Sequence, residues 1–293
     1  MTVTTTRRTT TYLAPKTLEA LLRITADAHA TVLAGGTDLI PRWKKDDTAV
    51  PTTVVDVKRI AQLKGVTIAD GVVHVGACTL MSELAEAPVI RREAPVLAEA
   101  AGRVACAQIR NRATIGGNLA NASPAADTAV PLLLLDAVAV IATHGPAGVG
   151  SREVALTDFF KGPGKTALNA GEILTAIRFT SSAGAGYWAW DKLGTRPAME
   201  IAVAGVGVLL RRKGGIITHA RIGYGSVAPV PMRGSAAEAV LVGHSLDDET
   251  VARCVAAARE EITPISDVRA SAGYRRAIVG TFLRRMLLDA RSC

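Results

Sequence analysis

The sequence contains the stretch Leu33-Ala34-Gly35-Gly36-Thr37-Asp38-Leu39 and, about 80 residues later, the stretch Ala113-Thr114-Ile115-Gly116-Gly117-Asn118. A double glycine lets backbone N–H groups converge where any Cβ would collide, and converging N–H groups bind anions, usually phosphate. Hydroxyl groups accompany both loops at Thr37, Thr114 and Ser123. The pattern predicts a pyrophosphate held from two sides, and therefore a dinucleotide cofactor.

Other familiar motifs do not match. A Rossmann fingerprint needs three glycines in one strand-to-helix turn, and a Walker loop needs a Gly-Lys-Ser/Thr sequence. The five histidines are far apart, and no Gly-x-Ser-x-Gly or His-Glu-x-x-His occurs. Cys78, Cys106, Cys254 and Cys293 show no cluster or zinc spacing, so we expect buried free thiols. We predict no catalytic residue and no metal site in this chain.

Length and composition favour a compact chain of two domains. It has 293 residues, is 49% hydrophobic and only 4% aromatic, and contains no apolar run long enough to span a bilayer. The net charge of +8 comes from scattered arginines without interleaved aromatic residues. This distribution argues against nucleic acid and fits an anionic cofactor and acidic partners. No apolar segment follows Arg7 and Arg8, so we expect a polar tail rather than a signal peptide, and a cytoplasmic protein.

The first part of the chain reads as alternating helices and strands. Asp70-Gly71 between alternating apolar runs indicates a hairpin. The predicted helices cover residues 17–28, 90–102, a segment beginning near residue 79 and a segment opened by Pro124, with a turn or short helix at 38–43. The predicted strands cover residues 31–34, 54–57, 66–69, 72–77 and 137–142, and the segments 154–161 and 172–179 complete the domain.

A Ser/Gly/Ala stretch at residues 181–186 is the best linker candidate, and the pattern changes after it. Strands are predicted at 187–192, 201–211 and 216–227, with a reversal at Lys213-Gly214-Gly215. Helices follow at 236–241, 248–262 and 270–288. Strands followed by helices indicate an α+β layer.

Together, these segments resemble the FAD-binding subunit of molybdenum hydroxylases, which includes the medium subunits of carbon monoxide dehydrogenase and of bacterial xanthine, aldehyde and aromatic dehydrogenases. The stretches at 192–202, 221–229 and 264–276 carry the resemblance further, in the family's order. It implies an α+β fold with a vanillyl-alcohol-oxidase-type FAD-binding domain at 1–180, in subdomains of about 1–57 and 58–180. A small α+β domain at 187–293, with a three-stranded sheet plus helices, would follow.

The resemblance also assigns roles to single residues. Asp127 matches a position that contacts the flavin, and a helix N-cap, the simpler explanation, is compatible with that role. Lys192 matches a lysine beside the isoalloxazine ring, whereas a surface position is the default. The candidate FAD-binding residues, from the loops and the resemblance together, are Leu33, Ala34, Gly35, Gly36, Thr37, Asp38, Leu39, Ile40, Val104, Thr114, Ile115, Gly116, Gly117, Asn118, Ser123, Asp127, Ile173, Leu174 and Lys192. Periodicity alone places Val104, Ile173 and Leu174 in the core.

The implied function is electron transfer. A chain of this family binds FAD noncovalently and accepts electrons from [2Fe-2S] clusters on a small partner subunit, while a large partner subunit holds the molybdenum cofactor, plausibly in a dimer of heterotrimers. The carbon monoxide enzyme typically has His-Ser where Thr37-Asp38 stand here, which argues against carbon monoxide as substrate. Two alternatives stay open: a self-sufficient flavin oxidase of the vanillyl-alcohol oxidase type, and a scaffold subunit without flavin. The arginine-rich segment 264–276 is either a docking segment or a solvated helix entrance.

Overall fold

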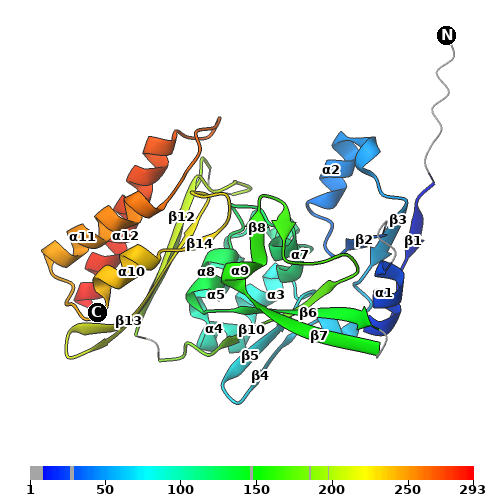
Figure 1. Ribbon diagram of the computed structural model, residues 1–293, viewed down its shortest axis with the longest axis horizontal. Coiled ribbons are helices and arrows are strands. Elements are labelled where there is room, and N and C mark those ends of the chain that lie inside the picture. Colours follow the sequence, from blue (N-terminus) through cyan, green and yellow to red (C-terminus); the bar gives the residue numbers. More distant parts are fainter. Residues whose placement is uncertain (1–8, 27–29, 146–147, 185, 197) are drawn as a thin grey trace, which may run out of the picture.

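The computed structural model describes residues 9–26, 30–145, 148–184, 186–196 and 198–293. The N-terminal tail with Arg7 and Arg8 and the end of the helix predicted at 17–28 lie outside these residues. Three sheets follow one another along the long axis of the molecule (Figure 1). Within the described part of the chain, we find no helix that combines the length and the apolar character needed to cross a membrane.

The N-terminal sheet is small and parallel. Its strands lie in the order β1 (Thr11–Leu13), β3 (Thr53–Asp56) and β2 (Ala30–Leu33). Helix α1 (Leu18–Thr25) begins as predicted at Thr17, whose side chain accepts a hydrogen bond from Ala20 N at 3.2 Å. Helix α2 (Leu39–Lys45) and a 3-10 turn (Asp47–Ala49) connect β2 to β3. The first glycine pair lies between β2 and α2.

The central sheet has five antiparallel strands in the order β4 (Val66–Ala69), β5 (Val72–Gly76), β10 (Ile173–Thr180), β6 (Val138–Gly145) and β7 (Gly148–Ala155). The predicted hairpin is confirmed, because Asp70 and Gly71 both adopt positive φ, as a type I′ turn requires. The segment 154–161 is more divided than predicted. It contains the end of β7, helix α9 (Leu156–Phe159) and the start of β8 (Phe160–Gly162), which pairs with β9 (Lys165–Thr166).

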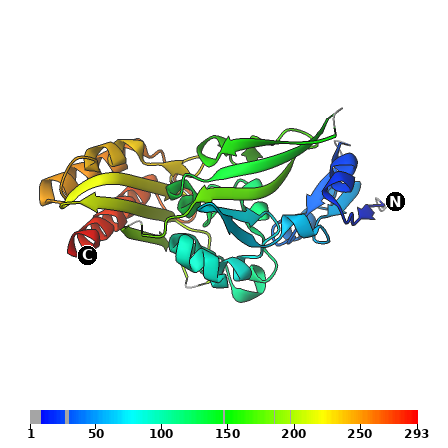
Figure 2. The same cartoon turned by 90° about the horizontal axis from the view of Figure 1, so that it is seen from below.

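Short helices cover one side of this sheet, as the cyan helices in Figure 2 show. The helices between β5 and β6 in the chain are α3 (Met81–Glu86), α4 (Pro88–Glu93), α5 (Pro95–Gly102), α6 (Ala107–Arg110), α7 (Ile115–Ala120) and α8 (Ala129–Leu134). The single helix predicted at 90–102 is wrong. Ala94 has φ −148° and breaks it, because the residue before a proline avoids the helical conformation. Pro124 also opens no helix, since α8 begins five residues later.

The C-terminal sheet has the order β11 (Tyr187–Leu193), β12 (Ala204–Lys213), β13 (Ile216–Gly225) and β14 (Met232–Arg233). The sequence predicts three strands, and the two-residue β14 is the addition. The strand predicted at 201–211 begins only at Ala204, because Ile201 is exposed ahead of it. Helices α10 (Ser235–Leu241), α11 (Asp248–Glu261) and α12 (Ala272–Ser292) pack with this sheet around its own core.

Helix α8 joins the central and C-terminal parts. A Cβ added to Gly207 of β12 would lie 2.9 Å from Leu134 Cδ1, and one added to Gly223 of β13 would lie 3.2 Å from Val130 Cγ1. Glycine at these positions therefore lets α8 approach the C-terminal sheet closely. This packing holds the segment just before α8 against β11, where the candidate site lies.

Candidate cofactor site

The first glycine loop offers free donors. The backbone N–H groups of residues 35 to 39 donate to no acceptor within the described residues. Gly36 has φ +72°, a left-handed conformation that side chains other than glycine adopt at a cost. The Asp38 carboxylate accepts a hydrogen bond from Arg42 Nη2 at 3.0 Å and so pairs with α2. Consecutive unpaired N–H groups match the anion-binding concavity that the sequence predicts here.

Gly35 sets the distance between the two glycine loops. A Cβ at this position would lie 2.1 Å from Arg112 O and 3.0 Å from Ala113 Cα. The first loop therefore packs against the backbone directly before Thr114, and no larger residue fits. The structure thus brings the two glycine stretches together, although the first follows β2 of the N-terminal sheet and the second lies in α7, about 80 residues later.

The second glycine pair works differently from the prediction. Its N–H groups are already used: Ile115 N donates to Thr79 O at 3.1 Å, Gly116 N to Ala77 O at 2.8 Å, and Gly117 N to Thr114 Oγ1 at 3.1 Å. A Cβ on Gly116 would lie 2.6 Å from Ala77 O. These glycines therefore allow α7 to pack against the end of β5, and converging backbone donors at this pair are a wrong expectation. The donors available to an anion come from the first loop.

Polar side chains continue from α7 toward α8. Asn118 Oδ1 accepts a hydrogen bond from the buried Thr128 Oγ1 at 2.6 Å, which leaves the Asn118 amide nitrogen as a donor. Ser123 Oγ accepts from Ala125 N at 3.2 Å and stabilises the turn before Asp127. This network places Asn118 next to the segment that carries Asp127.

Lys192 and Asp127 form a buried ion pair. Lys192 Nζ lies 2.7 Å from Asp127 Oδ2 and donates to Arg103 O at 2.9 Å. The Lys192 side chain is only 3% exposed, so the surface position expected by default is wrong. Burial raises the pKa of Asp127, and this cause outweighs the lowering by the Lys192 charge. Asp127 also does not cap a helix, since α8 begins after Thr128.

Glu200 is a member of this cluster that the sequence does not indicate. Its Oε1 lies 3.9 Å from Lys192 Nζ, and its side chain is 9% exposed. A Cβ on Gly194 would lie 1.3 Å from Glu200 Oε2, so Gly194 makes the room that this carboxylate occupies. The quoted stretch at 192–202 contains Glu200, but nothing in the stretch says that this carboxylate turns back toward Lys192.

Arg103 and Trp190 complete the surroundings. The Arg103 guanidinium lies 5.0 Å from the Trp190 ring centroid, in a cation–π contact, and pairs with Asp191 at 2.9 Å. Trp190 Nε1 is buried without a hydrogen-bond partner within the described residues. Trp190 also lines a small cavity with Asp127, Lys192 and Ser226.

The three apolar candidates are all buried. Val104 is 9% exposed and follows Arg103, whose carbonyl binds Lys192. Ile173 belongs to the cluster of Leu21 and Leu22, against which Ala34 of the first loop packs, and Leu174 belongs to the central core. These positions agree with the core assignment from periodicity, and their contact with a cofactor stays a prediction.

The residues present fit a dinucleotide. The unpaired N–H groups of the first loop suit phosphate oxygens, and the Gly35 contact brings the second loop beside them. Asn118 bonds to Thr128, the neighbour of Asp127 in the chain, and Asp127 pairs with Lys192, which bonds to the carbonyl of Arg103 directly before Val104. The site thus has two parts. The backbone amides of the first loop suit a pyrophosphate, and the buried cation beside apolar side chains suits a ring system.

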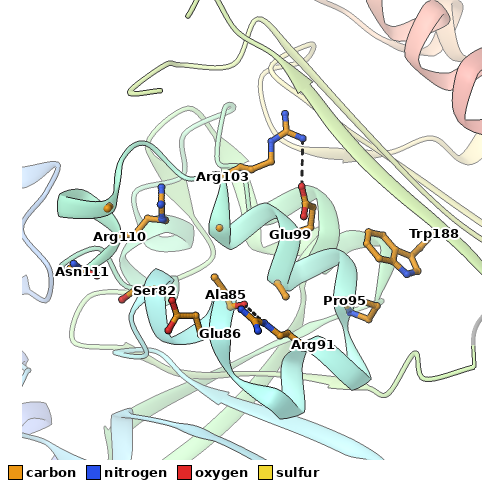
Figure 3. Close-up of a pocket in the computed structure, with 13 residues that line it drawn as sticks. Ser82, Ala85, Glu86, Arg91, Pro95, Glu99, Arg103, Arg110, Asn111 and Trp188 are labelled. Carbon is orange, nitrogen blue, oxygen red and sulfur yellow. Dashed lines mark hydrogen bonds and ion pairs between the residues drawn. The ribbon is translucent and has the colours of Figure 1, made fainter. Parts of the chain in front are cut away.

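A second hollow lies behind the Arg103–Arg110 segment. This groove encloses about 540 Å³ between α3, α5, α6 and β11. Figure 3 shows its charged side chains over the helices, with Trp188 and Pro95 on one side. It contains no residue of the two glycine loops, so it is distinct from the candidate cofactor site.

The cysteines only partly follow the expectation. Cys78 and Cys254 are buried, and burial raises the pKa of the Cys78 thiol to about 11 and that of Cys254 to about 12. Cys293 is exposed and Cys106 is half-buried. Within the described residues, no group of three or more His, Cys, Asp or Glu side chains is arranged to hold a metal ion.

Two family profiles match most of the chain. The profile described as "FAD binding domain in molybdopterin dehydrogenase" matches residues 7–180, and "CO dehydrogenase flavoprotein C-terminal domain" matches residues 189–290. The carbon monoxide dehydrogenase medium chain of Hydrogenophaga pseudoflava is 34% identical over 94% of this chain and 95% of its own length. The putative xanthine dehydrogenase FAD-binding subunit of Escherichia coli is 34% identical over 94% and 93%.

Solved structures agree with these family matches. A chain of the Hydrogenophaga pseudoflava carbon monoxide dehydrogenase that lacks the Mo-pyranopterin moiety superposes with a TM-score of 0.91 at 34% identity, covering 97% of this chain and 98% of the other. A chain of quinoline 2-oxidoreductase from Pseudomonas putida gives a TM-score of 0.89 at 30% identity, covering 97% of each chain. The fold and site therefore define an FAD-binding flavoprotein of the oxidoreductase class. The chain belongs to the FAD-binding domain family of the molybdopterin dehydrogenases, which confirms the resemblance and the α+β fold.

Proposed function

We propose that this chain is the electron-transfer subunit of a molybdenum hydroxylase complex. It receives electrons from [2Fe-2S] clusters on a small partner subunit and delivers them to an external acceptor. The observation that carries the proposal is the set of unpaired amides at residues 35–39, packed against the second glycine loop, together with the buried Lys192–Asp127 pair. Anion donors in one part of the chain and a buried cation in another fit a bound dinucleotide.

The residues have separable roles in this proposal. The amides of the first loop and the side chains of Thr114, Ser123 and Asn118 bind the pyrophosphate and its surroundings. Lys192, fixed by Asp127 and Glu200, keeps a buried positive charge at the ring system, which stabilises negative charge that develops there. Bound FAD supplies the redox chemistry, because it accepts and releases electrons. The apolar side chains of Val104, Ile173 and Leu174 exclude water around it.

The partners follow from the kind of protein that the relatives are. Their names describe medium chains and FAD-binding subunits of dehydrogenases, so this chain is proposed to work beside a large molybdopterin-binding subunit and a small iron–sulfur subunit. We propose a dimer of heterotrimers located in the cytoplasm, and a division of the chain at 1–180 and 187–293. The substrate is set by the large subunit.

Co-expression tests this proposal. The chain expressed with its molybdopterin and iron–sulfur partners is expected to purify as one hetero-oligomer with one noncovalent FAD per copy of this chain. Acid precipitation should release the flavin, because neither loop contains a histidine or cysteine that could link it. Flavin that stays with the precipitate, or a colourless complex, would contradict the proposal. A colourless complex would favour the scaffold alternative.

A further inference from the structure

The groove behind the Arg103–Arg110 segment has the composition of a protein-binding surface. Its lining includes the small residues Ala85, Ala98, Gly102 and Ala107, and also Trp188, which is 37% exposed. Arginine and tryptophan are enriched among the residues that dominate binding energy at protein interfaces. An exposed indole in a groove lined by small side chains offers a place for an apolar side chain of another protein.

The charges of the groove favour an acidic occupant. It carries three arginines, at positions 91, 103 and 110, and two glutamates, at positions 86 and 99. Arg103 is already paired with Asp191 and Glu99. Arg91 and Arg110 form no ion pair within the described residues and donate only to backbone carbonyls, those of Ala85 and Val104. Their guanidinium groups therefore keep donors for carboxylates, which they bind with two parallel hydrogen bonds.

The groove also lies directly behind the candidate cofactor site. The segment that separates the two carries Val104 and is hydrogen-bonded from both sides. On the side of the candidate site, Lys192 Nζ donates to the Arg103 carbonyl. On the side of the groove, Arg110 Nη1 donates to the Val104 carbonyl at 3.0 Å. A protein bound in the groove therefore contacts the same short segment that forms a wall of the candidate site. Electron transfer requires such a close approach of donor and acceptor.

We propose that this groove is the docking surface for the iron–sulfur subunit, which inserts an acidic segment with an apolar side chain between Arg91, Arg110 and Trp188. This inference rests on the proposed function and adds the face through which the electrons arrive. An open groove with exposed charged side chains fits a protein segment better than a small molecule, since small-molecule sites bury most of their ligand.

The test is the dissociation constant between the FAD-loaded chain and the purified iron–sulfur subunit. Arg91→Glu and Trp188→Ala are each expected to weaken binding about tenfold, and the weakening by Arg91→Glu should shrink as salt is added. Arg253→Glu is the matched control, because Arg253 lies exposed on α11 and forms no ion pair within the described residues. All three variants should keep their FAD, since none contacts the candidate cofactor site.

Three results would separate the possibilities. If the wild type binds the iron–sulfur subunit and both groove variants bind equally well, the docking assignment is wrong and the proposed function stands. If the wild type binds FAD but not the iron–sulfur subunit, the proposed function itself fails. If NADH alone protects residues 82–111 from hydrogen exchange and displaces the partner, the groove is a nucleotide site and the docking assignment is overturned.

Discussion

Lys192 Nζ and Asp127 Oδ2 lie 2.7 Å apart, although the two residues are 65 positions apart in the chain. Asp127 precedes α8 in the central part, and Lys192 lies within β11 of the C-terminal sheet. The pair therefore connects the two halves at the candidate site. Buried charges are costly unless they are paired and hydrogen-bonded. Here the Arg103 carbonyl accepts a second hydrogen bond from the Lys192 ammonium group.

Asp127 should give the protein a specific dependence on pH. Burial raises its folded-state pKa above the unfolded value of about 3.9. Its contribution to stability is therefore fully present below that unfolded value and is lost as the pH rises through the folded-state pKa. The free energy of unfolding of the wild type, measured relative to Asp127→Asn by urea denaturation, should fall as the pH rises from about 4. A difference that does not change with pH would contradict this assignment.

Glu200→Gln should raise the midpoint potential of the bound flavin. The substitution removes a buried negative charge 3.9 Å from Lys192 Nζ, so the positive charge of Lys192 would be less compensated at the position proposed for the ring system. We expect an increase of about 30 mV, the two-electron equivalent of ~1.4 kcal/mol. Glu99→Gln is the matched control, because Glu99 also lies 3.9 Å from a cation, Arg103, but at the surface. Equal shifts in both variants would show that Glu200 does not act through Lys192.

Gly36→Ala should lower FAD affinity while the fold persists. Gly36 has φ +72°, and an added Cβ would lie 3.1 Å from Leu33 Cδ1 and Ile40 Cγ1. The loop must shift, and its unpaired amides shift with it. Gly71→Ala is the control, since Gly71 has φ +73° and open space around it. Both variants carry a similar backbone strain of about 1 kcal/mol, so only the first should lose flavin in equilibrium dialysis. Full retention of FAD by Gly36→Ala would show that this glycine only forms a turn and does not contribute to FAD binding.

Arg275 stabilises the C-terminal part of the chain from within the segment 264–276, for which the sequence suggests either docking or a solvated helix entrance. It is 3% exposed and binds the carbonyls of Val203 and Ser226 and the Asp267 carboxylate. Arg275→Met leaves two carbonyls without donors and should lower the free energy of unfolding by about 2–4 kcal/mol. Arg269→Met is the control, since Arg269 pairs with the same Asp267 but is exposed. Similar small losses in both would contradict the structural role.

Asp267 should make acid destabilise the same segment. Hydrogen bonds from Arg269 N and Ala270 N, together with Arg275, lower the pKa of Asp267 to about 2. A carboxyl group with a lowered folded-state pKa stabilises the protein above its unfolded value, and the contribution is lost as the pH falls toward 2. The stability difference between wild type and Asp267→Asn should therefore shrink as the pH falls from about 4 toward 2. A difference that stays constant over this range would contradict the assignment to Asp267.

The sequence predicts those turns and helix ends that are determined by one or two neighbouring residues. Asp70-Gly71 marks its hairpin because that dipeptide favours the two positive φ angles of a type I′ turn, and Thr17 marks the start of α1 because its hydroxyl caps the helix. Pro95 could also have been recognised, since the residue before a proline resists the helical conformation. The break in the helix predicted at 90–102 follows from that rule.

Long-range contacts were beyond the sequence. Nothing near Gly116 indicates that Ala77 O will accept its N–H, and so the second glycine pair suggests an anion site where the structure has packing. The burial of Lys192 likewise depends on the carboxylate of the distant Asp127 and on a turn of the chain that brings Glu200 back toward it. The family resemblance gives Gly116 and Lys192 as candidates. Glu200 and Arg103 are recognised as members of the site only from the contacts that they make.

The most direct test of the central claim is the rate at which the flavin of the FAD-loaded chain loses its oxidised absorbance after rapid mixing. Mixed with the reduced iron–sulfur subunit, the chain is expected to be reduced quickly. Mixed with the organic substrate of the assembled complex and no partner, it is expected to stay oxidised. Rapid reduction of the isolated chain by that substrate would contradict the electron-transfer account and establish the self-sufficient oxidase in its place.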